Sequence, residues 1–379
     1  MGNFRPLIKL PLRQSAPRVA ASCLIQTLTG LGLGWLFAIA ARAELPPPPR
    51  FADWCNRQTT LAPATQHTIT VLLEVAETRD CQEAERTLSR RTVLHLPNSQ
   101  ISDLQPLTGL PALKTLVLSG NQVSDLRPLQ ALKQLTTLVL DANQITDLQP
   151  LATLTGLTTL VLDSNQISDI RPIAQLTQLT SLLLYDNRIS DLHPLKKLVN
   201  LRALSLYSNQ ISDLRPLSGL TNLRFLALYS NQISDLRPLA GLTRLNRLLL
   251  FENQITDLRP LAALTGLESL TLFQNQISDL QPLTSLTNLN ELILGNNPIR
   301  NILPLATLTN LRQLALFNTA VTDITPLQTL TNLAYLDLYN TQVSNPQPLR
   351  SLTKLNWLDL RKTPLTLEQC PVAATVCRF

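Results

Sequence analysis

The sequence predicts an α/β repeat solenoid, in which short strands and turns follow one another in one elongated stack. From residue 91 the pattern LxxLxLxxNxIxDLxPLxxLxx recurs every 22 residues, with no insertion or deletion. Hydrophobic residues make up 44% of the 379-residue chain and aromatic residues only 4%, so the apolar content is mostly leucine. A single copy of this pattern could not bury its own leucines, so the copies must stack on one another.

Each position of the repeat has a mechanical explanation. In the copy that begins at residue 113, Leu116 and Leu118 alternate with polar or exposed positions, which predicts a strand with one buried side. Asn121 follows, and its amide can satisfy backbone groups of the loop and of the adjacent coil. Asp125 is then expected to cap a short helical turn, in which Pro128 occupies a position that needs no backbone donor.

The asparagine recurs in most copies and is replaced near both ends of the repeat. It is present at Asn143, Asn165, Asn187, Asn209, Asn231, Asn253, Asn275 and Asn297. Hydroxyl residues replace it at Ser99, Thr319, Thr341 and Thr363. A hydroxyl has fewer hydrogen-bonding groups than an amide, so we expect weaker coupling between coils at the ends.

These residues resemble the leucine-rich repeat family, and within it the 22-residue internalin-like subtype, over residues 91–365 as twelve full copies and a partial one. The resemblance implies a curved right-handed arc or horseshoe. A parallel β-sheet would line its concave face, and short 3-10 helices would lie on its convex side. It also implies that partners bind the concave face. The sequence after the repeats resembles neither an Ig-like domain nor a cell-wall anchoring tail, so host-cell invasion is not implied.

Residues 1–43 are predicted to be a signal peptide. Basic residues precede an apolar stretch that is densest over residues 28–41, and Ala41-Arg42-Ala43 places small residues where a signal peptidase reads them. The alternative is an uncleaved N-terminal membrane anchor over residues 19–41. Residues 44–54 are predicted to be a proline-rich spacer. We therefore expect an extracytoplasmic protein (secreted, periplasmic or on the cell surface), which would contact a membrane only through an uncleaved N-terminal segment.

The segments that flank the repeats are expected to be caps. Residues 55–90 predict a helical N-terminal cap, with an amphipathic helix over 66–77 and a second helix that begins at Asp80. Residues 366–379 predict a C-terminal cap.

The cysteines of the mature chain lie near its two ends. The cysteines after the signal segment are Cys55, Cys81, Cys370 and Cys377. Three connectivities are possible in principle. Since the two ends of an elongated array are far apart, Cys55–Cys81 and Cys370–Cys377 are the pairs we expect, formed in an oxidising compartment. A zinc site is disfavoured, because CxxC spacing and nearby histidines are absent from the sequence.

Charge and motif content argue against nucleic-acid binding and against catalysis. The formal charge is +6, but residues 1–43 carry five basic and no acidic side chains, so the rest of the chain is nearly balanced. The sequence contains only three histidines, His67, His95 and His193, and no recognisable catalytic or phosphate-binding motif. One aspartate per coil would also fit a calcium ladder, but turn capping explains every member of that column. We expect a non-enzymatic protein without a cofactor or a metal site.

Aromatic residues concentrate at the positions expected to form the concave surface. Ten of the thirteen aromatic residues after residue 43 fall there. One stripe consists of Tyr185, Tyr207, Tyr229, Phe251, Phe273, Phe317 and Tyr339, and a neighbouring one of Phe225, Tyr335 and Trp357. Charged residues interleave with the stripes, among them Arg202, Arg224 and Arg247.

Two functions and one structural explanation fit the aromatic stripes. The favoured function is binding of a protein partner, for which Tyr and Phe are large anchors of low conformational entropy. The alternative is an envelope or surface protein that binds glycan by stacking sugars on the rings. The structural explanation is that aromatic residues on neighbouring strands only stabilise the sheet. Binding of a protein through the interleaved charges should depend on salt, whereas sugar stacking should not.

Overall fold

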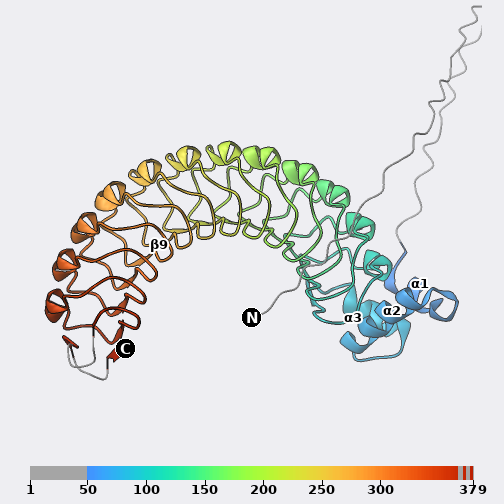
Figure 1. Cartoon of the computed structure of the whole chain (residues 1–379). Coiled ribbons are helices and arrows are strands. Elements are labelled where there is room, and N and C mark those ends of the chain that lie inside the picture. The colour runs from blue at the N-terminus through green and yellow to red at the C-terminus, as the bar shows by residue number, and fades with distance from the viewer. Residues whose placement is uncertain (1–48, 366–369, 373–375, 379) are drawn as a thin grey trace, which may run out of the picture. The chain divides into compact units, whose positions relative to one another are not determined.

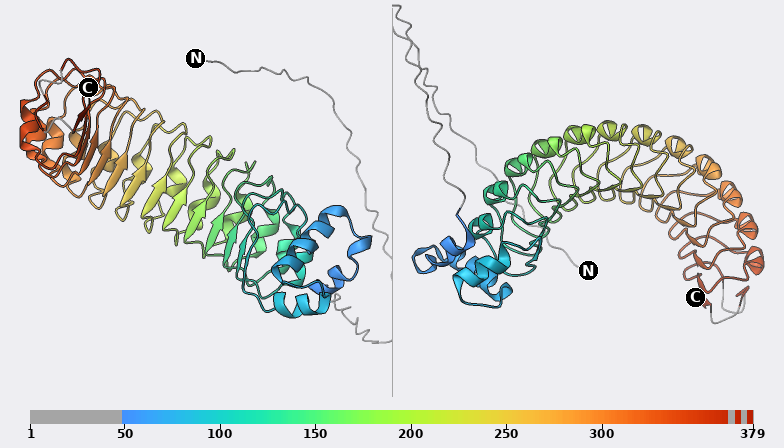
Figure 2. Two further views of the ribbon diagram at one scale, coloured as in Figure 1. Left: turned by 90° about the horizontal axis from the view of Figure 1, so that it is seen from below. Right: turned by 180° about the vertical axis from the view of Figure 1, so that it is seen from behind.

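The computed structural model describes residues 49–365, 370–372 and 376–378. These residues lie in one unit, Pro47–Phe379, in which coils of about 22 residues stack into an arc (Figure 1). Each coil places a short strand on the inner side of the arc and a 3-10 turn on the outer side (Figures 1 and 2). The predicted solenoid with a parallel concave sheet is therefore confirmed.

The described strands form one parallel sheet in sequence order. Its register is shifted by one repeat at each step, so that Leu204 pairs with Leu226 and every leucine lies beside its equivalent. The strands are β1 (Val93–His95), β2 (Thr115–Val117), β3 (Thr137–Val139), β4 (Thr159–Val161), β5 (Ser181–Leu183), β6 (Ala203–Ser205), β7 (Phe225–Ala227), β8 (Arg247–Leu249), β9 (Ser269–Thr271), β10 (Glu291–Ile293), β11 (Gln313–Ala315), β12 (Tyr335–Asp337), β13 (Trp357–Asp359) and β14 (Cys377–Arg378).

The convex side is formed by 3-10 turns, each of which contains a proline near its start. They are η2 (Gln105–Gly109), η3 (Arg127–Ala131), η4 (Gln149–Thr153), η5 (Arg171–Gln175), η6 (His193–Lys197), η7 (Arg215–Leu217), η8 (Arg237–Leu239), η9 (Arg259–Leu261), η10 (Gln281–Ser285), η11 (Leu303–Thr307), η12 (Thr325–Thr329) and η13 (Gln347–Ser351). The N-terminal end has η1 (Gln58–Thr60) and the helices α1 (Phe51–Cys55), α2 (Pro63–Val75) and α3 (Cys81–Leu88).

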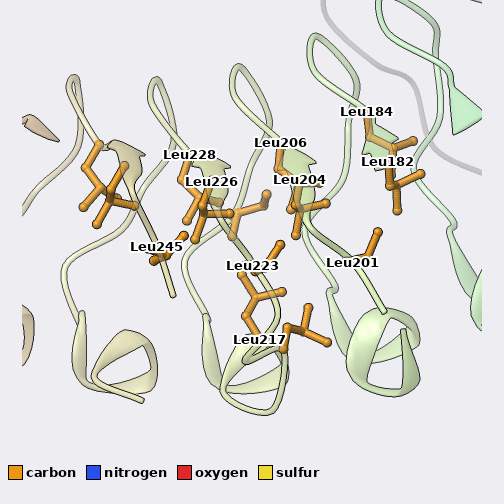
Figure 3. Packing of buried hydrophobic residues seen from close by; sticks show 14 of the residues in the cluster. Leu182, Leu184, Leu201, Leu204, Leu206, Leu217, Leu223, Leu226, Leu228 and Leu245 are labelled. Carbon is orange, nitrogen blue, oxygen red and sulfur yellow. The ribbon is translucent and has the colours of Figure 1, made fainter. Parts of the chain in front are cut away.

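The space between the strands and the 3-10 turns is filled by leucine. Leu204, Leu206 and Leu217 are fully buried, and Figure 3 shows them packed between strand and turn with their equivalents from the next coils. Burying one such side chain contributes about 1.5–3 kcal/mol relative to leaving it exposed. Because each coil covers the leucines of the next, the core is continuous along the described repeats.

A ladder of asparagine side chains couples each coil to the one before it. The Asn209 Nδ2 donates to the carbonyl of Leu184 in the preceding coil (3.0 Å) and to that of Leu206 in its own (3.1 Å). Its Oδ1 accepts the N–H of Ile189 at 2.9 Å. The same pattern recurs from Asn121 to Asn297, so we call this column the asparagine ladder.

The hydrogen bonds at the C-terminal end agree with the expected weakening. The hydroxyls of Thr319, Thr341 and Thr363 donate to leucine carbonyls of their own coils, three residues earlier. A smaller amide ladder lies one residue away on the surface, where Asn318 Nδ2 donates to Asn296 Oδ1 and Asn340 Nδ2 donates to Asn318 Oδ1. The bridge between coils thus moves from the buried position to an exposed one.

The aspartate column caps the convex turns, as expected. Asp213 Oδ1 accepts the N–H of Arg215, the first residue of η7, at 2.9 Å, and Pro216 follows. The Arg215 guanidinium also donates to both carboxylate oxygens of Asp213, and these bonds lower the pKa of Asp213 to about 2. The arginine is 81% exposed, so such a pair contributes at most about 1 kcal/mol.

The N-terminal cap begins earlier than the sequence indicated. The sequence predicts a spacer over residues 44–54, but α1 begins at Phe51, which is fully buried. A Cβ at Gly109 would lie 2.3 Å from the Phe51 backbone nitrogen, so glycine is required where α1 packs on η2. Helices α2 and α3 match the two expected helices, and Asp80 caps α3 by accepting the N–H groups of Gln82 and Glu83.

Both expected disulfides are present. Cys55 is bonded to Cys81 between α1 and α3, and Cys370 to Cys377 at the C-terminal end. Strand β14 pairs with β13 and covers the last coil, in keeping with a C-terminal cap. The predicted signal peptide lies outside the described residues. Among those that are described, no helix is both long and apolar enough to cross a membrane.

We predict that Asn209→Ala destabilises the protein by about 2–3 kcal/mol, because it leaves buried backbone groups of two coils without partners. The measurement is chemical denaturation followed by circular dichroism. The matched control is Asn246→Ala, at an exposed position of the concave surface. Equal losses for the two variants would contradict a coupling role for the asparagine ladder.

Candidate partner-binding surface

Five aromatic rings stack along the concave surface. They belong to Tyr185, Tyr207, Tyr229, Phe251 and Phe273, and we call them the aromatic ladder. Successive ring centroids are 4.2, 4.0, 3.9 and 4.3 Å apart, with interplanar angles of 9–14°. The parallel sheet places equivalent residues about 4.8 Å apart, which is why flat rings at one register position stack face to face.

The next members of the predicted stripe are arranged differently. The coil after Phe273 has Gly295 at the equivalent position, and the Phe317 ring tilts over it, with its centroid 6.2 Å from that of Phe273 at 49°. A Cβ at Gly295 would lie 2.5 Å from atoms of the Phe317 ring. Tyr339 instead lies under two cations, Arg361 at 5.4 Å and Lys362 at 5.1 Å from its ring centroid.

The second predicted stripe is two separate features. Tyr335 and Trp357 stack at 4.0 Å, and the Arg378 guanidinium lies over Trp357. Phe225 lies at the equivalent position of β7, beside Arg247 of β8, and the coils of β9, β10 and β11 separate Arg247 from Tyr335. The sequence placed all three aromatic residues in one column correctly, but the structure does not join them into a continuous surface.

The rings of the aromatic ladder are half-buried, because each covers the face of the next. Their edges and the tyrosine hydroxyls are what remain for contact with another molecule. Stacked pairs of this kind contribute about 0.5–1.5 kcal/mol each beyond their burial. The aromatic ladder therefore stabilises the sheet, and whatever binds it meets ring edges.

A buried carboxyl group ends the aromatic ladder on its N-terminal side. Asp163 is 2% exposed, and its Oδ1 accepts the N–H of Tyr185 at 2.9 Å. Burial, with smaller contributions from Asp141 and Asp186, raises the pKa of Asp163 to about 7. Burial and the Asp163 charge raise the pKa of Tyr185 to about 12. Sequence reasoning missed Asp163, although it occupies the same repeat position as the ladder tyrosines.

A polar pocket of about 320 Å³ lies beside the N-terminal ends of the central strands. We call it the rim pocket; its lining includes Thr180, Asn200, Arg202, Asn222, Arg224 and Arg244. The sequence pointed to Arg202 and Arg224 but not to Arg244, which lies just before the positions read as concave. Arg247, the third predicted arginine, is exposed on β8 and is not part of the pocket lining.

A second hollow of about 540 Å³ continues along the same rim. It is lined mainly by amides, together with one acid and one base, Glu268 and Arg312. The rim thus changes from a basic section to a mixed one within a few coils.

The described residues show no constellation of catalytic or metal-binding groups. No cluster of three or more His, Cys, Asp or Glu side chains that could hold a metal ion occurs among them. His67 Nε2 is hydrogen-bonded to the carbonyl of Ser99, where the N-terminal cap meets the first coil. His193 Nδ1 is hydrogen-bonded to Asp191 on the convex side, so the two histidines do not belong to one site.

Comparisons with known proteins agree with this geometry. A family model described as leucine-rich repeats matches residues 92–131, 133–175 and, in overlapping placements, 177–351. The chain belongs to the leucine-rich repeat family. A search of curated proteins gave no match.

Solved structures with the same architecture include an internalin. Internalin InlF from Listeria monocytogenes is 34% identical, with 81% of this chain and 98% of that one covered and a TM-score of 0.69. A leucine-rich repeat protein of Leptospira interrogans is 25% identical over 71% of this chain and 74% of its own, with a TM-score of 0.67. The ectodomain of the Arabidopsis thaliana receptor kinase GASSHO1/SCHENGEN3 is 25% identical, with 71% and 38% covered and a TM-score of 0.58. The chain is thus an internalin-like member of the family.

We predict that Asp163→Asn removes part of the pH dependence of stability. The pKa of Asp163 is higher in the folded state, about 7, than its ordinary value of 3.8. The folded protein therefore keeps a proton that the unfolded chain releases, and stability falls as pH rises from about 4 to about 7. Asparagine keeps the acceptor for Tyr185 but cannot ionise. The variant should match the parent in Tm near pH 4 and exceed it at about pH 8.

Thermal denaturation at both pH values measures this difference, with Glu268→Gln, which replaces an exposed carboxylate, as the control. If the Tm of the parent falls between the two pH values by no more than the Tm of Asp163→Asn, the raised pKa of Asp163 is contradicted.

Proposed function

We propose that this protein is an exported, non-enzymatic interaction module that binds a protein partner on its concave surface. The proposal depends mainly on one observation: the same face of the protein presents the edges of aromatic rings and arginines that have no acidic partner among the described residues. Arginine and tyrosine are enriched at the residues that dominate binding energy in interfaces. Strands β1–β13 give a sheet about 58 Å long, which is ample for a standard footprint.

The relatives support a protein partner and an extracytoplasmic location. The structure of the Arabidopsis receptor is an ectodomain in complex with CASPARIAN STRIP INTEGRITY FACTOR 2. In this protein one disulfide crosslinks each end of the repeat array, and disulfides persist in oxidising compartments. Together with the predicted signal peptide, these observations support export to the periplasm, the medium or the cell surface.

The geometry of the aromatic ladder favours protein over glycan. Sugars stack on the faces of aromatic rings, but inside the ladder each face is covered by a neighbour at 3.9–4.3 Å. Ring edges and hydroxyls suit the mixed apolar and polar contacts of a protein surface.

We predict that a photo-crosslinking amino acid at Arg247, on the concave surface, forms an adduct with a partner from envelope or culture-medium fractions. The same amino acid at Arg237, exposed on the convex side, should not form that adduct. Adding Tyr207→Ser and Tyr229→Ser to the Arg247 probe should reduce adduct yield at least about tenfold, because two central anchors are lost.

The control is the pair Tyr207→Phe and Tyr229→Phe, which keeps the ring stacking. Circular dichroism confirms that every variant is folded. A partner captured equally well from the convex position, or unaffected by the serine substitutions, would refute concave binding.

A further inference from the structure

Two arginines of the rim pocket, Arg202 and Arg224, lie side by side in consecutive coils. The backbone N–H of Arg224 donates to the carbonyl of Arg202 at 2.8 Å, so the two side chains leave the sheet at neighbouring register positions, about 4.8 Å apart. Arg244, which lies at the end of the same copy as Arg224 and just before strand β8, lines the same pocket. All three are exposed, and no acidic side chain is part of the pocket lining. Their positive charges are therefore left uncompensated within the pocket.

The convex side of the same coils shows that this chain can neutralise its arginines. There Arg215, Arg237 and Arg259 each pair with the aspartate two residues before them, at 2.8 Å. Among the described residues no ion pair is formed by Arg202, Arg224 or Arg244. Paired arginines and unpaired arginines thus occur on two faces of the same coils, so the difference does not follow from the overall charge of the chain.

Hydrogen bonds hold the walls of the rim pocket in place. The Arg244 guanidinium donates to Asn222 Oδ1, and Asn222 Nδ2 donates to the carbonyl of Val199 at 2.9 Å. Asn200 Nδ2 donates in the same way to the carbonyl of Thr177 at 2.9 Å. One guanidinium is thus oriented before any ligand arrives, which reduces the entropy cost of binding.

We propose that the rim pocket is an anion-binding subsite that takes the carboxylates of a short acidic peptide segment of the partner. This inference rests on the proposed function and names the chemistry of the partner. Guanidinium groups bind carboxylates through two parallel hydrogen bonds. A volume of about 320 Å³ lies at the small end of ligand pockets.

The charges around the pocket limit how far an anion can extend toward the C-terminal coils. Glu268 lies two coils after Arg224 at the equivalent position, and it lines the neighbouring hollow. A polyanion that continued along the rim toward the C-terminal coils would meet this carboxylate, whereas Thr180, Thr158 and Thr136 occupy the equivalent positions on the other side. A short acidic segment ends before it, which favours a peptide over a long sulfated glycan.

The test measures binding of fluorescein-labelled hexaglutamate to the full folded protein by fluorescence anisotropy. The parent should bind, and binding should weaken between about 20 and about 300 mM NaCl. The Arg202→Gln, Arg224→Gln double variant should lose about tenfold in affinity or more, because charged hydrogen bonds are removed. Replacing both arginines with lysine should give an intermediate loss, since charge is kept and the two-bond geometry is not.

The matched control is Arg215→Gln, Arg237→Gln on the convex side, which should bind like the parent. Equal affinity of the two glutamine variants, or no binding by the parent, would overturn the proposal. If a heparin fragment displaces labelled hexaglutamate at a lower concentration than unlabelled hexaglutamate does, the pocket binds sulfated glycan. That result would overturn the proposal that its ligand is an acidic peptide.

The two proposals can fail separately. If the Arg202→Gln, Arg224→Gln variant still forms the Arg247-position adduct at full yield, the subsite is refuted and concave binding stands. If hexaglutamate binds as expected but the adduct is absent, the basic subsite stands and the proposed function is refuted.

Discussion

The side-chain amide of the asparagine ladder is the interaction on which the rest of the structure depends. Leucine burial drives the coils together, but it is non-directional and would tolerate a slip between neighbours. The amide donates to carbonyls of two coils and accepts from a backbone N–H that the sheet cannot reach. It therefore fixes each coil relative to the last, and every surface feature inherits that register.

The aromatic ladder is a consequence of this register. Rings stack face to face only when equivalent side chains are held at one constant spacing over several coils. The same spacing brings Arg202 and Arg224 together, where like charges are held close on exposed side chains. The constant spacing of equivalent side chains thus produces both stabilising and destabilising contacts, and the residue type at each position decides which of them results.

The repeat made the fold predictable because it leaves one way to bury the leucines. The period, the strand positions and the turn caps follow from local spacing, and the disulfide pairs follow from the distance between the two ends of the array. The start of α1 did not follow, because Phe51 belongs to no repeat and its helix is buried by packing on α3 and η2. For the concave surface, the sequence identified the columns of aromatic residues. It did not show that each ring would cover the face of its neighbour, because that depends on how the rings are rotated. Asp163 and Arg244 were missed because their environment is set by neighbouring coils.

The replacement of asparagine by threonine has a consequence for how the molecule comes apart. Thr319, Thr341 and Thr363 leave the last coils without the buried amide bridge. Besides the leucine core and the sheet hydrogen bonds, what bridges these coils lies on the surface: the Asn318 and Asn340 amides, the Tyr335–Trp357 stack and the cations over Tyr339. In a stack where each coil contacts only its neighbours, opening starts where the interface is weakest. The C-terminal coils would thus fray before the centre, and slow amide exchange would be confined to the coils that keep the asparagine ladder, which include those that carry the aromatic ladder and the rim pocket.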